Sequence, residues 1–293
     1  MTTSSAFKPR RSCLYMPGSN VRALDKAASL PADVLIFDLE DAVAPDEKAD
    51  ARARVSSAIA TTDYGTREIV VRINALSSEW GADDLQAIMA DSPSAVLVPK
   101  VSTPEEVHAV QSALNSAGSS DTTIWIMIET PLAVLNLQSI ARAAGDTQLD
   151  ALVVGTNDLA KDLRAQPDAE RAVFLPALSQ VVMAARAYGL SAIDGVFNDI
   201  KQPEGLAVEC HQGRALGFDG KTLIHPSQLD VANRVFSPSA VDIDDAQAIV
   251  DAFNAPTNQG KGVITVNGRM TERLHLEQAR YTLAIAEAIA DRS

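Results

Sequence analysis

The stretch Thr123-Ile-Trp-Ile-Met-Ile128, followed at once by Glu129, decides how this chain folds. It is continuously apolar and rich in β-branched and aromatic residues, which predicts a strand buried on both faces, as in a parallel sheet. A carboxylate directly after such a strand lies at the strand's carboxyl end, where parallel α/β folds bind their ligands. The stretch therefore predicts both the type of sheet and the edge that carries the site.

Similar short apolar runs recur along the chain and alternate with helical segments. The other expected strands cover residues 13–16, 34–37, 69–73, 95–99, 151–154, 191–193 and 222–224. Eight alternations of roughly 30 residues each favour a closed (β/α)8 TIM barrel. The alternative is an open doubly wound sheet. Its dinucleotide-binding version is weakened because no GxGxxG pattern follows a strand.

Two of the intervening helices have clear sequence boundaries. A helix over 104–115 is expected because Thr103 can cap it, Pro104 suits the first turn and Glu106 stands three residues after the cap. A second helix is expected over 169–188, closed by Gly189.

After residue 236 the alternation stops and a different architecture begins. We expect a short helix around 244–253 and a hairpin of 263–266 with 269–270, whose Asn267-Gly268 pair predicts a type I′ turn. A last helix places one apolar face together, made of Leu276, Ala279, Leu283, Ala286 and Ala290. The sequence thus divides into a catalytic barrel over 1–236 and a helix–hairpin–helix appendage over 237–293.

Composition excludes several classes of protein. The 293 residues are 46% hydrophobic and 22% charged, which suits a globular domain with a large core and no need of disulfides. A net charge of −13 argues against nucleic-acid and anionic-membrane partners. With only Cys13 and Cys210, no visible signal peptide and no run of 18 apolar residues, we expect a cytoplasmic protein.

Polar side chains gather where the predicted strands end. They are Asp38, Glu40, Asp41, Arg72, Lys100, Glu129, Asp158, Asp194 and His225. Glu129 and Asp158 follow adjacent strands and can converge on one hard cation while leaving room for water and substrate, as Mg²⁺ prefers. The alternative is that the two are unrelated acids in ion pairs. No histidine pair has the spacing of a zinc site.

Arg72 ends its strand, and two interpretations of it stay open. Its guanidinium can clamp a substrate carboxylate or stabilise an enolate oxygen. It can equally serve as partner for the acids that follow the second strand, of which Glu40 and Asp41 are candidates for holding it. Lys26 on its own is more typical of a solvated surface lysine, and His225 before Pro226 suits a helix cap.

Several motifs stand in a characteristic order and resemble one family. They are Arg11-Ser-Cys-Leu-Tyr-Met-Pro-Gly18, Asp38-Leu-Glu-Asp-Ala-Val43, Val71-Arg72-Ile-Asn74, Ile128-Glu129-Thr130, Gly155-Thr-Asn-Asp158-Leu and Lys221-Thr-Leu-Ile-His-Pro226. The set resembles the citrate lyase β-subunit-like CoA-ester lyases of the phosphoenolpyruvate/pyruvate barrel superfamily, which include malyl-CoA and citramalyl-CoA lyases. The resemblance covers nearly the whole chain, tail included.

This resemblance implies a Mg²⁺-dependent, reversible Claisen-type cleavage with an acyl-CoA substrate and a 2-oxoacid product. It assigns Glu129 and Asp158 to the metal and Arg72 to the substrate. It also places Tyr15, Lys26, Ile224 and His225 at the acyl-CoA site, so that these four, Arg72 and Glu129 are the expected substrate-binding residues.

In the resembled family the tail is a lid over a neighbouring subunit's site, and members are commonly homo-trimers or hexamers. The lid carries an acid in a Met-x-Asp context, which reads Met270-Thr-Glu272 in this chain. The longer Glu272 side chain moves the carboxyl group outward. Its expected role is that of an acid, or of a base in the synthetic direction.

The expected reaction is cleavage of citramalyl-CoA or malyl-CoA to acetyl-CoA and pyruvate or glyoxylate. Three other functions remain open from the sequence. They are a malyl-CoA thioesterase, a citrate lyase β subunit acting on an acyl-carrier-protein thioester, and a non-catalytic acyl-CoA-binding subunit.

Overall fold

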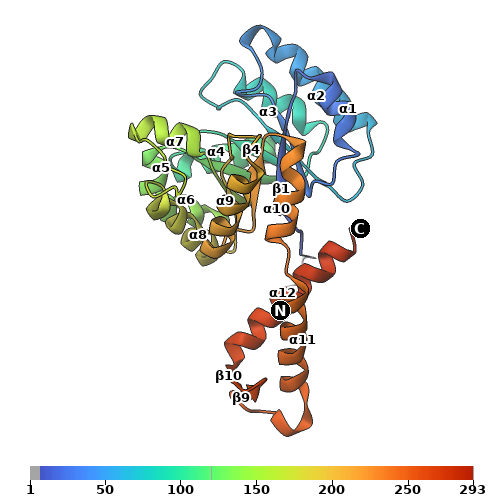
Figure 1. Ribbon diagram of the computed structural model, residues 1–293. Helices are drawn as coiled ribbons and strands as arrows, with labels where there is room; N and C mark the ends of the chain where they lie inside the picture. Colours follow the sequence, from blue (N-terminus) through green and yellow to red (C-terminus); the bar gives the residue numbers. More distant parts are fainter. Residues whose placement is uncertain (1–6, 120, 293) are drawn as a thin grey trace. The chain divides into compact units, whose positions relative to one another are not determined.

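The computed structural model describes residues 7–119 and 121–292 (Figure 1). The described chain falls into two compact units. One is Arg10–Arg234, and the other joins the residues from Val235 onward with those before Arg10. Each unit is described by itself below.

The first unit is a closed barrel of eight parallel strands in sequential order. Its strands are β1 Ser12–Pro17, β2 Val34–Asp38, β3 Glu68–Arg72, β4 Ala95–Val98, β5 Thr123–Ile128, β6 Leu149–Val154, β7 Ser191–Asp194 and β8 Gly220–Leu223. The barrel closes because β1 pairs with β8, with Cys13 opposite Thr222, as well as with β2. The (β/α)8 prediction is confirmed, and the open doubly wound sheet is excluded.

Helices connect successive strands around the outside of the barrel, and α10 follows the last strand, β8 (Figure 1). They are α1 Val21–Ala27, α2 Lys48–Thr61, α3 Gly81–Met89, α4 Pro104–Ser116, α5 Pro131–Leu135, α6 Leu137–Arg142, α7 Thr156–Leu163, α8 Leu175–Tyr188, α9 Pro203–Leu216 and α10 Leu229–Phe236. The predicted start of α4 is confirmed, because the Glu106 carboxylate accepts the Thr103 N–H at 2.9 Å.

The predicted start of α8 was wrong by six residues. The segment before Leu175 is not helical, since Arg171 has a left-handed backbone with φ 55° and turns its side chain inward to Asp194. Pro176 then occupies the first turn of α8, where a missing N–H costs nothing.

Alternate residues of the strands fill the barrel interior. The buried cluster includes Cys13, Val34, Ile36, Val70, Ala95, Leu97, Trp125, Met127, Ala151, Val153 and Ile193. The residues between them are buried beneath the helices, which explains why the strands read as continuous apolar runs. A packed interior leaves only the two ends of the barrel for polar groups.

Buried ion pairs close the amino end of the barrel. The Arg10 guanidinium donates to both oxygens of Glu68 at 2.8 Å, contacts Asp150 and lies 4.6 Å from the centre of the Trp125 ring. It also donates to the Ser191 hydroxyl at 2.8 Å. Because these partners belong to four strands, one arginine ties the bottom of the barrel together.

The second unit holds α11 Ala240–Asn254, the antiparallel strands β9 Val263–Val266 and β10 Arg269–Glu272, and α12 Arg273–Ala290. Phe253, Ile264, Val266 and Leu276 form its buried cluster. Asn267 and Gly268 have φ of 49° and 75°, which confirms the predicted I′ turn geometry. No helix within the described residues is both long and apolar enough to cross a bilayer.

Replacing Arg10 tests the closure of the amino end. Arg10→Met should lower the free energy of unfolding by about 3–5 kcal/mol, because the buried carboxylate of Glu68, 4% exposed, would lose the two hydrogen bonds of the guanidinium. Urea unfolding measures this change. Arg54→Met is the control, since Arg54 pairs with exposed Asp50 at 3.6 Å and its loss should cost less than about 0.5 kcal/mol. Equal effects of the two substitutions would contradict the account.

Candidate active site

A pocket of about 320 Å³ lies at the carboxyl end of the barrel strands. It is lined by Tyr15, Pro17, Asp38, Asp41, Ala42, Arg72, Met127, Glu129, Val154, Gly155, Thr156, Asn157, Asp158, Val196, Asn198, Thr222 and Ile224. These residues come from the strand ends and from the loops that follow them. The position is the one at which parallel barrels carry their chemistry.

Arg72 is the main cation of the pocket and is held from several sides. Its Nε and Nη2 donate to the two oxygens of Asp38 at 2.7 and 2.6 Å, a bidentate pair buried at the ends of adjacent strands. Its Nη1 lies 3.1 Å from Glu40, 3.5 Å from Asp41 and 3.8 Å from the Met127 sulfur. Nη1 is thus the guanidinium nitrogen that Asp38 leaves to other anions.

The aromatic ring of Tyr15 packs against the Arg72 guanidinium. The guanidinium carbon lies 4.7 Å from the centre of the Tyr15 ring, within the range of a cation–π contact. The Tyr15 hydroxyl lies 4.0 Å from the Met127 sulfur. Burial raises the pKa of Tyr15, so the phenol keeps its proton at neutral pH.

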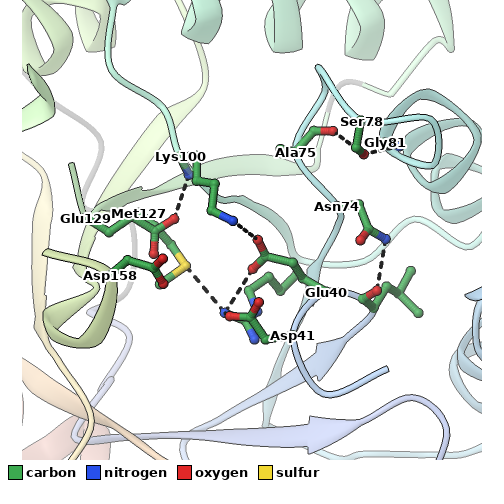
Figure 2. A network of polar contacts seen from close by, with 12 residues as sticks. Glu40, Asp41, Asn74, Ala75, Ser78, Gly81, Lys100, Met127, Glu129 and Asp158 are labelled. Carbon is green, nitrogen blue, oxygen red and sulfur yellow. Dashed lines mark hydrogen bonds and ion pairs between the residues drawn. The ribbon is translucent and has the colours of Figure 1, made fainter. Parts of the chain in front are cut away.

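Figure 2 shows how Lys100 links the two sides of the pocket. Its backbone N–H donates to Glu129 Oε1 at 2.7 Å, and its ammonium lies 3.4 Å from Glu40 Oε1. The other oxygen of Glu40 contacts Arg72. Carboxylates and cations therefore alternate from Glu129 through Lys100 and Glu40 to Arg72.

Glu129 and Asp158 come from neighbouring strands, as the sequence predicted. Glu129 follows β5 and is 2% exposed, while Asp158 lies in the first turn of α7 after β6, with its side chain 26% exposed. A Cβ on Gly155 would stand 2.5 Å from Glu129 Oε2. Only glycine lets β6 pass this close to the Glu129 carboxylate.

Negative charge exceeds positive charge around the pocket. Five carboxylates gather there, on Asp38, Glu40, Asp41, Glu129 and Asp158. Within the described residues, the basic side chains in contact with them are Arg72, Lys100 and Lys161, the last 3.2 Å from Asp158. The buried Lys48 ammonium also lies near these acids, because it donates to the Glu40 backbone carbonyl at 2.8 Å. The acidic side chains still outnumber the basic ones, which favours a bound cation such as Mg²⁺.

The state of Glu129 fits a site made to receive such a cation. Burial, with the nearby charges of Glu40 and Asp158, raises the pKa of Glu129 to about 7. In the described chain no set of three or more His, Cys, Asp or Glu side chains is arranged to hold a metal. Glu129 and Asp158 therefore make a two-carboxylate candidate that water and substrate oxygens would complete, a donor set suited to Mg²⁺.

The pocket brings together five of the residues that the sequence singled out, namely Tyr15, Arg72, Glu129, Asp158 and Ile224. Arg72 pairs with the acids after β2, as one interpretation expected, and it also lines the pocket. Its role toward a substrate stays a prediction.

Three other predicted residues lie elsewhere. Lys26 is exposed on α1 and is not among the lining residues. His225 is exposed, and its Nδ1 accepts the Ser227 N–H at 3.2 Å, so it caps the short helix Pro226–Gln228. Glu272 ends β10 in the second unit, where its N–H donates to His275 Nδ1 at 2.9 Å. Direct roles for these three stay predictions.

The structure adds residues that the sequence had not indicated. Met127 is a strand residue like its neighbours in the sequence, yet its sulfur contacts Tyr15 and Arg72. Asn157 and Asn198 join the start of α7 to the loop after β7, since Asn198 Nδ2 donates to Asn157 Oδ1 at 2.8 Å. For Asn157 and Asn198 the sequence offered one signal, namely their position just after predicted strands.

Comparison with known proteins places the chain in a family. Residues 11–226 match the model of the HpcH/HpaI aldolase/citrate lyase family, and the chain belongs to this family. A relative named (3S)-malyl-CoA thioesterase from Cereibacter sphaeroides (strain ATCC 17029) is 48% identical over 282 residues, 96% of each chain. Citrate lyase subunit beta of Escherichia coli K12 is 34% identical over 286 residues, 96% of this chain and 94% of that one.

Solved structures show the same likeness. Protein CitE from Mycobacterium tuberculosis, in complex with magnesium, acetoacetate and coenzyme A, has a TM-score of 0.78 at 29% identity and covers 96% of this chain and 99% of its own. A citrate lyase beta subunit from the same organism, complexed with oxaloacetate and magnesium, has a TM-score of 0.68 at 31% identity. That match covers 78% of this chain and 98% of the other.

The raised pKa of Glu129 predicts a pH-dependent stability in the absence of metal. Between about pH 4.5 and 7 the folded protein keeps a proton that the unfolded chain has lost, so stability falls as pH rises through this window. Glu129→Gln should therefore stabilise the metal-free protein at pH 8, by on the order of 2–3 kcal/mol, and much less at pH 4.5.

Urea unfolding of the metal-free protein at several pH values measures this difference. Glu277→Gln, at an exposed position of α12, is the control and should leave the pH profile unchanged. A Glu129→Gln effect that is the same at pH 4.5 and pH 8 would contradict the assignment.

Proposed function

We propose that this protein is a Mg²⁺-dependent CoA-ester lyase that cleaves a short 3-hydroxyacyl-CoA with a carboxylate at its far end, malyl-CoA or citramalyl-CoA. The products would be acetyl-CoA and glyoxylate or pyruvate. One observation carries the proposal. A single pocket holds the paired carboxylates Glu129 and Asp158 together with the Nη1 edge of Arg72.

Glu129 and Asp158 would hold the Mg²⁺, which supplies Lewis acidity toward the hydroxyacid part of the substrate. This is the end of the substrate remote from the thioester. Groups placed there favour breaking the bond between C2 and C3 rather than the thioester bond. The magnesium complexes of the structural relatives with oxaloacetate and with acetoacetate and coenzyme A support this arrangement.

The chain's own residues supply the remaining requirements of the cleavage. Loss of the hydroxyl proton and rupture of the C2–C3 bond leave the electron pair on the acetyl thioester as an enolate. Arg72 Nη1 is placed to bind a carboxylate or to stabilise a developing oxyanion, since Asp38 and the Tyr15 ring fix the guanidinium. Protonation of C2 then gives acetyl-CoA.

Asp41 must give way when an anion reaches Arg72. Its carboxylate lies 3.5 Å from Nη1 and its side chain is 62% exposed, so it can turn toward solvent at little cost. Asp38, in contrast, is 1% exposed and stays in place. Arg72 therefore keeps Asp38 as a permanent partner and can exchange Asp41 for a substrate anion.

A second candidate is hydrolysis of malyl-CoA at the thioester bond. It is favoured by the relatives named (3S)-malyl-CoA thioesterase, which are 47–48% identical over 96% of this chain. Both reactions use the same substrate class, so products rather than binding distinguish them.

Product analysis separates these activities. The pure protein is incubated with (3S)-malyl-CoA or citramalyl-CoA, with Mg²⁺ or with EDTA, and acetyl-CoA is resolved from free CoA by chromatography. We expect acetyl-CoA and an equal amount of 2-oxoacid, and only with Mg²⁺, because the excess carboxylates need the cation. Free CoA with intact malate would establish the thioesterase. Binding without either product would favour a carrier-protein thioester or a non-catalytic subunit.

For the second unit we propose the role of a lid whose Glu272 protonates C2, in a homo-oligomer, as the resemblance implies. Glu272→Gln should lower kcat at least about tenfold and change KM less than about threefold, because general acid catalysis contributes to the reaction rather than to substrate binding. Steady-state kinetics measure both. Glu277→Gln on the same unit is the matched control. A change in KM alone would contradict the acid role.

A further inference from the structure

Lys100 has a backbone conformation that costs free energy without an obvious local reason. It follows β4 with φ 57°, the left-handed region that lysine rarely adopts. The other described non-glycine residues with positive φ are Ser92, Arg164, Arg171 and Asn267. Among these described residues, Lys100 is the one that contacts carboxylates of the pocket. Such conformations persist where the surrounding structure requires them and cluster at functional sites.

The left-handed turn lets one residue reach two different carboxylates. It aims the Lys100 N–H at Glu129 Oε1, at 2.7 Å, while the side chain extends to Glu40, at 3.4 Å (Figure 2). Glu129 belongs to the candidate cation site, and Glu40 contacts the arginine. The backbone and the ammonium of Lys100 thus serve opposite sides of the pocket.

The Lys100 ammonium acts through its contact with the Glu40 carboxylate. Its carboxylate is 7% exposed and has two cationic partners, Arg72 at 3.1 Å and Lys100 at 3.4 Å. The Lys48 ammonium donates to the Glu40 backbone carbonyl at 2.8 Å and not to its carboxylate. Without the Lys100 charge, more of the negative charge of Glu40 would therefore act on Arg72 Nη1. That nitrogen would then attract a second carboxylate more weakly, because its charge would already be neutralised.

We propose that Lys100 is a positioning residue with two separate tasks. Its backbone N–H orients Glu129, and its ammonium shares Glu40 with Arg72 so that Nη1 stays able to bind the carboxylate of an anionic substrate. The second task rests on the proposed function, since it assumes a substrate with a carboxylate near Arg72.

Three substitutions separate the two tasks. Lys100→Met removes the charge but keeps the N–H and the chain length. Lys100→Arg keeps the charge. Lys100→Gly removes the charge and also relieves the left-handed backbone. Ser92→Gly is the matched control, because exposed Ser92 has φ 48° and precedes β4, at the barrel end opposite the pocket.

The measurements are calorimetric titrations of Mg²⁺ into the metal-free protein and of oxaloacetate into the protein saturated with Mg²⁺. Lys100→Met should raise the Kd of oxaloacetate about tenfold, as expected for a weakened charge-assisted contact, and change the Kd of Mg²⁺ less than about threefold. Lys100→Arg should restore oxaloacetate binding to within about threefold of the parent.

Thermal unfolding provides the readout for strain. Lys100→Gly should bind oxaloacetate as weakly as Lys100→Met while its Tm exceeds that of Lys100→Met, since both lack the ammonium and only glycine accepts the left-handed conformation without strain. Ser92→Gly should change neither Kd. In turnover, Lys100→Met should raise KM more than it lowers kcat.

Several results would overturn the proposal. Unchanged oxaloacetate affinity in Lys100→Met would show that the ammonium has no such task. A parallel loss of Mg²⁺ affinity and Tm, without rescue in Lys100→Arg, would show a merely structural role.

Binding and turnover also keep this proposal apart from the proposed function. A parent protein that binds oxaloacetate with Mg²⁺ but cleaves no thioester would overturn the proposed function and leave the Lys100 test valid. A parent that turns over, with wild-type oxaloacetate affinity in Lys100→Met, would overturn the Lys100 proposal alone. A parent that binds no oxaloacetate would overturn the Lys100 proposal, while the products formed from malyl-CoA or citramalyl-CoA would still decide the proposed function.

Discussion

The bidentate ion pair between Arg72 and Asp38 is the interaction on which the rest of the site depends. The register of the barrel makes it, because Asp38 and Arg72 are directly paired residues at the ends of β2 and β3. Two short hydrogen bonds fix the plane of the guanidinium, and the Tyr15 ring supports one face. What remains free to act is one nitrogen, Nη1. Around it the fold collects the other acids, and in the proposed function strand pairing would therefore decide where a substrate anion binds.

The two ends of the barrel differ in how well their carboxylates are matched by cations. At the amino end the Arg10 guanidinium forms ion pairs with Glu68 and Asp150, and these pairs link strands of the barrel. At the carboxyl end the carboxylates exceed their cations, and burial raises the pKa of Glu129. An unmatched buried carboxylate lowers stability. A bound divalent cation relieves that cost, so the instability of the metal-free site and its affinity for a cation have the same origin.

Much of the fold could be predicted from the sequence because parallel strands are buried on both faces. The run from Thr123 to Ile128 is apolar for this reason, and the carboxylate after it is conspicuous. Glu129, Asp158 and Arg72 were found in this way, since each lies at the end of a strand or soon after it. The helix start misplaced before Leu175 has a different cause, because Arg171 turns inward to a partner on β7 that is distant in sequence.

The features that sequence reasoning missed depend on contacts through space. The need for glycine at 155 arises from the Glu129 carboxylate on the neighbouring strand, and the unusual backbone of Lys100 arises from two carboxylates on different elements. His225 shows the converse, because the cap that its position before Pro226 suggested is the contact the structure displays. Local patterns report local structure, while the chemistry of the pocket is set by which strands are neighbours.

The most direct test of this account is a crystal structure with Mn²⁺ and oxaloacetate, with the metal located by its anomalous signal. The account predicts one metal within about 2.1–2.3 Å of oxygens from both Glu129 and Asp158. It also predicts an oxaloacetate carboxylate about 3 Å from Arg72 Nη1, with Asp41 turned away. A metal bound elsewhere, or oxaloacetate that does not reach Arg72, would contradict it.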